Sequence, residues 1–246
     1  MARKAHIALI EDDEAVLDAL RLYLINKAFK VTTHLSADAF LEQYDAAKPP
    51  DCVVSDVRLP GKSGLQLQEA LKKRGAKFPL LLITGHGDIE MAVSALKAGA
   101  HDFLEKPFRE ERLLQSITAA LETTAKARDR AEELGALIRR RAELTERQRQ
   151  VMDYATTGYT NRQIGELLEI SPRTVEIYRS QAMEKMGVGS LAELVRLDDA
   201  AFRALFAKSP VKRIGRDRFI RNVLIAIGNA GDEALAAEAR RLLGDA

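Results

Sequence analysis

The sequence is poor in several residue types, and each scarcity excludes a class of protein. A single cysteine, Cys52, excludes a disulfide framework, a cysteine zinc site and a self-contained iron–sulfur cluster. Tryptophan is absent and aromatic residues make up only 5% of the chain, so nothing suggests a platform for base stacking. No apolar run approaches membrane-spanning length, and no signal-peptide core follows Met1–His6. We therefore expect a cytoplasmic protein with no membrane partner.

Length and charge divide the chain into unequal parts. Its 246 residues are too many for one typical domain and enough for two small ones. The formal net charge of +2 is made up of −2 over residues 1–122, +2 over residues 123–197 and +2 over residues 198–246. This partition predicts an acidic first domain and a mildly basic remainder.

Short apolar runs alternate with helical patterns over residues 4–122. The predicted strands are His6–Ile10, Lys30–His34, Cys52–Ser55, Leu80–Thr84 and His101–Leu104. The predicted helices are Asp13–Lys27, Ala37–Ala47, Leu65–Arg74, Ile89–Ala98 and one that starts at Glu110. Strict alternation predicts an α/β domain with a five-stranded parallel sheet covered on both faces. Ligands of such sheets bind outside the carboxyl ends of the strands.

Charged and hydroxyl side chains gather at those strand ends. Glu11 and Asp12 follow the first strand, and Asp56 follows the third. Thr84 ends the fourth strand and Lys106 follows the fifth. Three carboxylates need a cation to share one site, and oxygen ligands suit Mg²⁺. A carboxylate beside such a metal can attack a phosphoryl group and form an aspartyl phosphate, whose oxygens the lysine and the threonine could bind.

Residues 4–122 resemble the receiver domain of two-component response regulators, particularly of the FixJ type. The resemblance rests on the motifs Ser55-Asp-Val-Arg-Leu-Pro-Gly61, Thr84-Gly-His-Gly-Asp88 and Asp102-Phe-Leu-Glu-Lys-Pro-Phe108. It implies a flavodoxin-like fold, phosphorylation by a cognate sensor histidine kinase, and dimerisation through the fourth helix and fifth strand. One residue departs from the pattern, because Glu11 stands where many receivers have aspartate.

The same resemblance implies a role for each residue of the site. Asp56 is the expected phosphoacceptor, and Mg²⁺ is expected to bind Glu11, Asp12, Asp56 and the backbone carbonyl of Arg58. Lys106 is expected to bind the phosphoryl group, Thr84 to move onto it, and Phe103 to rotate in response.

A helical pattern continues from Arg109 to about Leu144 without a proline, and residues 123–143 form the predicted linker. Its apolar residues follow a weak heptad that Gly135 interrupts, and glycine costs about 1 kcal/mol in a helix interior. Two interpretations stay open: a solvated linker helix, or a coiled connector that aligns two protomers.

Residues 144–197 contain the start and stop signals of four short helices. Thr145 with Gln148 begins the first and Gly158 ends it, and Asn161 is the predicted cap of Arg162–Leu168. Ser171 followed by proline opens Pro172–Met186, Gly187 ends it, and Ser190 starts a fourth helix. Such a series presents helix N-termini to phosphates and a helix side to base edges, as DNA-reading modules require.

This region resembles the LuxR/FixJ-type helix-turn-helix domain. The motifs are Leu144-Thr-Glu-Arg-Gln-Arg-Gln-Val151, Gly158-Tyr-Thr-Asn-Arg-Gln-Ile164 and Ser171-Pro-Arg-Thr-Val-Glu-Ile-Tyr-Arg-Ser180. The resemblance places Glu176, Ile177 and Ser180 in the major groove of double-stranded DNA, and it implies dimerisation through Leu191–Leu197. The expected phosphate contacts are Asn161, Arg162, Arg173, Thr174 and Arg179, and the expected core residues are Ile164, Leu167, Leu168, Val175 and Met183. An all-helical protein-binding module is the competing interpretation.

Residues 198–246 form a tail that closely resembles the C-terminal HEAT-like segment of epoxyqueuosine reductase. The resemblance rests on Ser209-Pro-Val-Lys-Arg-Ile-Gly-Arg216 and Arg221-Asn-Val-Leu-Ile-Ala-Ile-Gly-Asn229. The enzyme activity cannot be carried over, because the iron–sulfur clusters need many cysteines. What the resemblance implies is a helix pair, Arg218–Gly228 and Glu233–Leu243, whose apolar side must be covered. The DNA-binding domain, a second protomer or another protein could cover it.

The tail also has the densest basic cluster of the chain. Residues 208–221 contain six basic side chains and one acid, Asp217. Three interpretations stay open: contact with a DNA or RNA backbone, a solvated rim around a packing helix, or a remnant of gene fusion without function.

Together these features predict a phosphorylation-dependent DNA-binding transcriptional regulator that forms a homodimer on activation and is not an enzyme. The alternative is a phosphorylation-gated adaptor whose helical tail binds RNA or a protein partner. The two differ in whether phosphorylation changes the affinity for DNA or for a partner of the tail.

Overall fold

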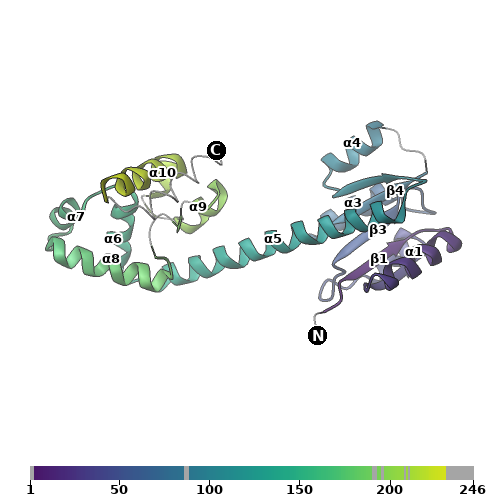
Figure 1. Ribbon diagram of the computed structural model, residues 1–246, viewed down its shortest axis with the longest axis horizontal. Coiled ribbons are helices and arrows are strands. Elements are labelled where there is room, and N and C mark those ends of the chain that lie inside the picture. The colour runs from purple at the N-terminus through teal and green to yellow at the C-terminus, as the bar shows by residue number, and fades with distance from the viewer. Residues whose placement is uncertain are drawn as a thin grey trace. The chain divides into compact units, whose positions relative to one another are not determined.

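The computed structural model describes residues 3–85, 89–189, 193–194, 197–207, 209 and 211–230. The chain divides into two compact units, Met1–Arg128 and Asp129–Ala246 (Figure 1). Within the described ranges, none of the helices combines the length and the apolar composition that crossing a bilayer requires.

The first unit is a parallel sheet with helices on both faces, as the alternation predicts. The strands β1 (His6–Ile10), β2 (Lys30–His34), β3 (Cys52–Asp56), β4 (Leu80–Thr84) and β5 (Asp102–Glu105) are ordered β2-β1-β3-β4-β5. The helices are α1 (Glu14–Asn26), α2 (Ala37–Gln43), α3 (Gly64–Lys73), α4 (Ile89–Lys97) and α5 (Glu110–Ala142). The predicted α/β fold is confirmed.

Each face of the sheet has its own apolar core. Alternate side chains of β1 point to opposite faces, so that Ile7 and Leu9 pack with α1 and α5, whereas Ala8 and Ile10 pack with α2, α3 and α4. The central strands β3 and β4 are buried along their whole length. This burial explains why their sequences read as uninterrupted apolar runs.

Several element ends differ from the prediction by a few residues. The helix α2 ends at Gln43 instead of Ala47, because the backbone becomes extended at Tyr44. The strands β3 and β5 each reach one residue further than expected. The helix α5 runs for 33 residues without a break at Gly135.

Gly64 lies where β3 leads into α3, and there is no room for a side chain. A Cβ atom on Gly64 would lie 2.4 Å from the backbone oxygen of Asp56 and 3.0 Å from Cα of Val57. We expect Gly64→Ala to lower the free energy of unfolding of the first unit by roughly 1–3 kcal/mol, measured by chemical denaturation.

Gly85→Ala is the matched control, because a Cβ atom there meets nothing within 4 Å. We expect its effect to stay within about 0.5 kcal/mol. Equal stability of the two variants would contradict the packing argument.

The second unit is helical throughout its described part. Its helices after α5 are α6 (Glu146–Thr156), α7 (Asn161–Leu168), α8 (Pro172–Met186), α9 (Asp199–Leu205) and α10 (Val211–Ala230). Most of the predicted fourth helix, Leu191–Leu197, lies outside the described residues, as does all of the predicted helix Glu233–Leu243. The helix predicted at Arg218–Gly228 starts earlier, at Val211, with a kink at Gly215.

Two predictions for α7 are wrong. Thr160, not Asn161, is the N-cap: its hydroxyl accepts from the backbone of Gln163, whose side chain accepts from the Thr160 backbone at 2.9 Å. Leu167 is 51% exposed instead of buried, because the buried stripe of this short helix consists of Ile164, Gly165 and Leu168.

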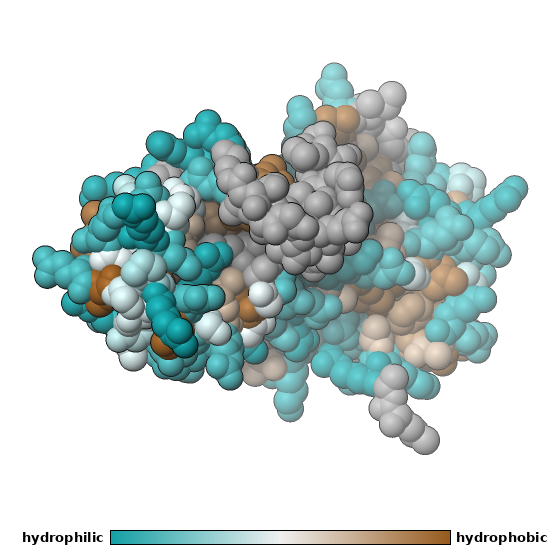
Figure 2. Space-filling model, turned by 60° about the vertical axis from the view of Figure 1, so that its left-hand side comes forward, coloured by the Kyte–Doolittle hydropathy of each residue, from teal (hydrophilic) through white to brown (hydrophobic). Residues whose placement is uncertain are grey.

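The described part of the tail belongs to the second unit. Phe202, Phe206, Phe219 and Val223 lie fully or almost fully buried in the apolar cluster that also holds Met186 of α8. The apolar side of α10 is therefore covered by α6 and α8 of the same chain. On the face shown in Figure 2, hydrophobic side chains appear as separate patches among hydrophilic ones.

Candidate functional sites

The strand ends bring two carboxylates and one ammonium group into direct contact. Glu11 follows β1 and Asp56 ends β3, and both are almost completely buried. Nζ of Lys106, which follows β5, lies 2.7 Å from Oε2 of Glu11 and 2.5 Å from Oδ2 of Asp56. Neighbouring parallel strands end at one edge of the sheet, which explains how residues 45 and 95 positions from Glu11 meet it.

Burial and pairing shift the protonation of this group in opposite ways. Burial raises the pKa of Glu11, and the hydrogen bond from Lys106 offsets only part of that effect. Burial by itself would lower the pKa of Lys106, but hydrogen bonds to Asp56 and Glu11 outweigh it and raise the pKa. The raised pKa of Glu11 means that its negative charge is disfavoured here, whereas the raised pKa of Lys106 means that the lysine keeps its positive charge.

The second oxygen of Asp56 is held by the backbone. The N–H of Arg58 donates to Oδ1 of Asp56 at 2.7 Å, while the side chain of Arg58 is exposed. The carboxylate is therefore oriented from two sides, by Lys106 and by the loop that follows β3. Asp12 is exposed, and Asp13 is occupied as the N-cap of α1.

Thr84 and Phe103 lie on the strands next to this group. Thr84 is fully buried at the end of β4, and its carbonyl accepts from the backbone N–H of Lys106 at 2.7 Å. Phe103 is half-buried on β5 and packs against the apolar cluster that includes α3 and α4. The Lys106–Pro107 peptide is cis.

A polar network on β5 and α5 was missed at the sequence level. Asp102 accepts from Arg112 at 2.9 Å and from the hydroxyl of Ser116 at 2.5 Å, and it also accepts from the backbone of Phe103. Arg112 and Ser116 lie 10 and 14 residues after Asp102 on a different element. No local sequence pattern predicts this contact, because only the packing of α5 on the sheet brings the three residues together.

Oxygen atoms dominate the groups that could hold a metal. Glu11, Asp12, Asp56 and the carbonyl of Arg58 are hard donors of the kind that Mg²⁺ prefers. Within the described ranges, no cluster of three or more His, Cys, Asp or Glu side chains has formed. The donors fit Mg²⁺ because two buried carboxylates share a single ammonium group, which balances only one negative charge. Burial makes the charge of Glu11 unfavourable, and a bound cation would offset this cost.

In the second unit, α7 and α8 pack closely through a tight turn. A Cβ atom on Gly165 would lie 2.7 Å from the backbone oxygen of Ile170, so only glycine permits this approach. Glu169 adopts the left-handed conformation that ends α7. Ser171 then caps α8 by accepting from the backbone of Thr174 at 3.0 Å, ahead of proline at the first turn.

Most of the predicted DNA contacts point to solvent. Ile177 is 49% exposed although its side chain is apolar. Three others lie half-buried: Asn161, Thr174 and Arg179. The remaining predicted contacts are exposed, and they are Arg162, Arg173, Glu176 and Ser180. The expected core residues Ile164, Leu168 and Val175 are buried.

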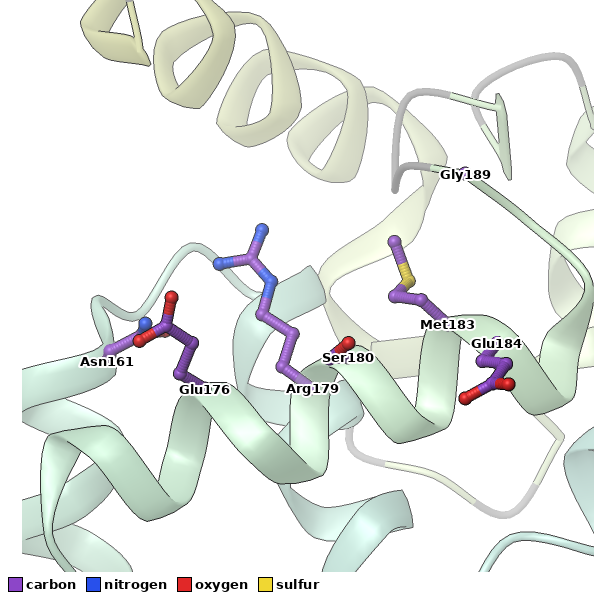
Figure 3. A pocket seen from close by; sticks show the side chains of 7 residues that line it. All are labelled: Asn161, Glu176, Arg179, Ser180, Met183, Glu184 and Gly189. Carbon is purple, nitrogen blue, oxygen red and sulfur yellow. The ribbon is translucent and has the colours of Figure 1, made fainter.

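A shallow pocket lies along this face of α8 (Figure 3). Glu176, Arg179 and Met183 project from the same side of α8, with Asn161 of α7 close to Glu176. Met183, expected in the core, is half-buried and lines the pocket together with Ser180, Glu184 and Gly189. The pocket thus gathers side chains that the sequence predicts for both phosphates and base edges.

Comparisons with known proteins cover both units. Residues 7–118 match the response regulator receiver domain family, and residues 142–197 match the luxR family of bacterial regulatory proteins. The transcriptional regulatory protein FixJ of Bradyrhizobium diazoefficiens is 44% identical over 80% of this chain and 96% of its own. The response regulator TodT of Pseudomonas putida is 41% identical over 80% of this chain and 86% of its own.

Two solved structures resemble the chain over most of its length. The response regulator StyR covers 78% of this chain and 96% of its own, with 39% identity and a TM-score of 0.64. Full-length FixJ from B. japonicum covers 82% of this chain and 98% of its own, with 42% identity and a TM-score of 0.52. Neither matched family range extends past residue 197.

Proposed function

Because this chain belongs to the FixJ-type response regulators and acts as a phosphorylation-dependent transcriptional regulator, we propose that Asp56 is its phosphoacceptor. One observation carries this proposal: Lys106 holds the buried carboxylate of Asp56 together with Glu11 at the carboxyl end of the sheet. The phosphoryl donor is the phosphohistidine of a sensor kinase.

In the proposed step, a carboxylate oxygen of Asp56 attacks the phosphorus of the phosphohistidine. An O–P bond forms, the N–P bond breaks, and the electron pair stays on the histidine nitrogen. The backbone N–H of Arg58 orients Oδ1 of Asp56. Lys106 then moves from pairing two carboxylates to pairing the new phosphoryl oxygens.

Mg²⁺ is the proposed cofactor, held by Glu11, Asp12, Asp56 and the carbonyl of Arg58. When bound, it neutralises charge on the carboxylates and the incoming phosphoryl oxygens. In the structure Asp12 is exposed and outside the contacts of Lys106, so its side chain can turn to a cation without breaking a buried pair.

We expect Mg²⁺ to stabilise the first unit and Asp12→Asn to weaken that effect. A ligand at ten times its Kd raises the free energy of unfolding by about 1.4 kcal/mol, which thermal denaturation with and without Mg²⁺ detects. Glu14→Gln is the control, because this neighbouring carboxylate is also exposed. If Mg²⁺ shifts both variants equally, Asp12 is not a ligand.

Thr84 and Phe103 are the proposed switch that follows phosphorylation. The hydroxyl of Thr84 moves onto the phosphoryl group, and Phe103 packs into the vacated space on the β4–β5 side of the sheet. The surface of α4 and β5 changes with it, and we propose that this surface forms the homodimer. Val93 and Leu96 of α4 are exposed apolar residues that a partner could cover.

The helix pair α7 and α8 is the proposed reader of double-stranded DNA. Glu176, Ile177 and Ser180 are assigned to the major groove, where glutamate accepts from cytosine and isoleucine packs on the thymine methyl group. Asn161, Arg162, Arg173, Thr174 and Arg179 are assigned to phosphates. We propose that the tail is a HEAT-like segment similar to the C-terminus of epoxyqueuosine reductase, and that it completes this DNA-binding unit.

Two substitutions on α8 separate these roles. Arg173→Ala is expected to weaken binding similarly for all sequences and to reduce the slope of log K against log salt by about 0.9. Glu176→Ala is expected to change the preferred base at one position by roughly 1–3 kcal/mol. Fluorescence anisotropy over a salt series and a set of single-base operator variants measures both.

The function itself is tested by phosphorylating the full chain with acetyl phosphate. We expect phosphorylation to raise the affinity for duplexes recovered by genomic footprinting and to shift the protein from monomer to dimer in sedimentation. DNA affinity that phosphorylation leaves unchanged would contradict the proposed switch.

A further inference from the structure

The outer side of α10 carries a basic surface that the helix-turn-helix does not account for. Lys212, Arg213, Arg218 and Arg221 are exposed, and Asp217 is the one acidic residue between Val211 and Ala230. None of the four forms an ion pair with another described residue. We call these four side chains the α10 basic surface.

The inner side of α10 fixes this surface in place. Phe219 and Val223 are buried in the cluster that contains Met152 of α6 and Ala182 of α8. After the kink at Gly215, one side of α10 belongs to the core, so Arg218 and Arg221 stay on its outer side. Lys212 and Arg213 precede the kink.

A hydrogen bond places α10 next to the N-terminal end of α7. Nδ2 of Asn222 donates to the backbone oxygen of Thr157 at 2.7 Å. Gly158 follows with a φ of +94°, and a Cβ atom there would lie 2.9 Å from Cγ of Asn222. Two residues later Thr160 caps α7, whose first turn contains Asn161 and Arg162.

Helical geometry puts an arginine on the same side as this contact. Arg218 precedes Asn222 by four residues and therefore lies one turn away on the side that meets the α6–α7 turn. Arg221 is adjacent on the exposed side. Figure 1 shows α10 running beside α6, which agrees with their direct packing.

We propose that α10 is a second phosphate-binding element, which extends the DNA interface of α7 and α8 along the duplex backbone. This inference rests on the proposed DNA-binding function. The hydrogen bond from Asn222 to Thr157 puts α10 beside the turn that leads into α7, whose first residues are assigned to DNA phosphates, and this position favours duplex DNA over another polyanion. Guanidinium groups bind phosphate oxygens without reading bases, so α10 adds affinity and salt dependence but no sequence preference.

The test compares two double variants in the full, phosphorylated chain. Arg218→Gln with Arg221→Gln removes two charges from the α10 basic surface. Arg130→Gln with Arg203→Gln removes two charges that are also exposed but lie elsewhere in the second unit, although Arg203 pairs with Asp199 at 2.6 Å. The probe is a duplex of about 30 base pairs that wild-type protein protects in footprinting, and thermal denaturation checks that both variants fold.

We expect the α10 variant to bind this duplex roughly tenfold more weakly and to lower the salt slope by about 1.8, as two lost phosphate contacts require. The base preference should stay as in wild type, and the control variant should keep the wild-type slope. An unchanged or increased affinity of the α10 variant overturns the inference while the helix-turn-helix function stands. The inference is also overturned if the α10 variant loses affinity only for single-stranded RNA of equal length and keeps its affinity for the duplex. Wild-type protein without salt-sensitive binding to any duplex overturns the DNA-binding function, and the α10 proposal with it.

Discussion

Asp56→Asn is expected to remove phosphorylation of the chain, with a loss of labelling rate on the order of 10³-fold or more. An amide oxygen is not a nucleophile toward phosphorus. Among the described residues, Glu11 is the one other carboxylate that pairs with Lys106. Mass spectrometry after incubation with acetyl phosphate and Mg²⁺ measures the result.

The fold should survive this substitution. Asparagine keeps an oxygen for the backbone N–H of Arg58, and Lys106 keeps its pair with Glu11. Asp18→Asn is the matched control, since Asp18 is exposed on α1, where it pairs with Arg21. Persistent labelling of the Asp56→Asn protein at another residue would refute the assignment of the phosphoacceptor.

Phe219→Ala is expected to lower the free energy of unfolding of the second unit by about 3–5 kcal/mol. The ring is fully buried, and its centroid lies 5.2 Å from that of Phe202 and 6.2 Å from that of Phe206. Arg141, itself paired with Asp153 at 2.7 Å, lies over the ring of Phe206. Removing Phe219 therefore opens a cavity beside the rings of Phe202 and Phe206.

This loss should appear in the full chain as an earlier unfolding transition of the second unit, together with weaker DNA binding at 37 °C. Leu167→Ala is the control, because this side chain is exposed in the same unit and its loss should change stability by no more than about 0.5 kcal/mol. If both variants unfold together, α10 is dispensable for the domain, and its interpretation as a structural part is wrong.

Local sequence signals are sufficient where a structural feature depends only on neighbouring residues. Ser171 followed by proline predicts the start of α8 correctly, because capping depends on residues three or four positions apart. Asn161 was wrongly predicted as the N-cap of α7. Thr160 can accept the same hydrogen bond one residue earlier, and Gln163 completes a capping box with it. Leu167 was misassigned because a short helix between two neighbours buries only a narrow stripe.

The sequence by itself determined the parallel sheet, the helix-turn-helix and the identity of the charged residues at the strand ends. Buried parallel strands and helix caps are encoded by neighbouring residues, whose spacing can be read directly. Only the tertiary structure decided that Lys106 bridges Glu11 and Asp56, and that α10 packs on α6 beside the N-terminal end of α7. These contacts join residues 50 to 95 positions apart, whose separation along the chain contains no periodic signal and is closed only when apolar surfaces pack.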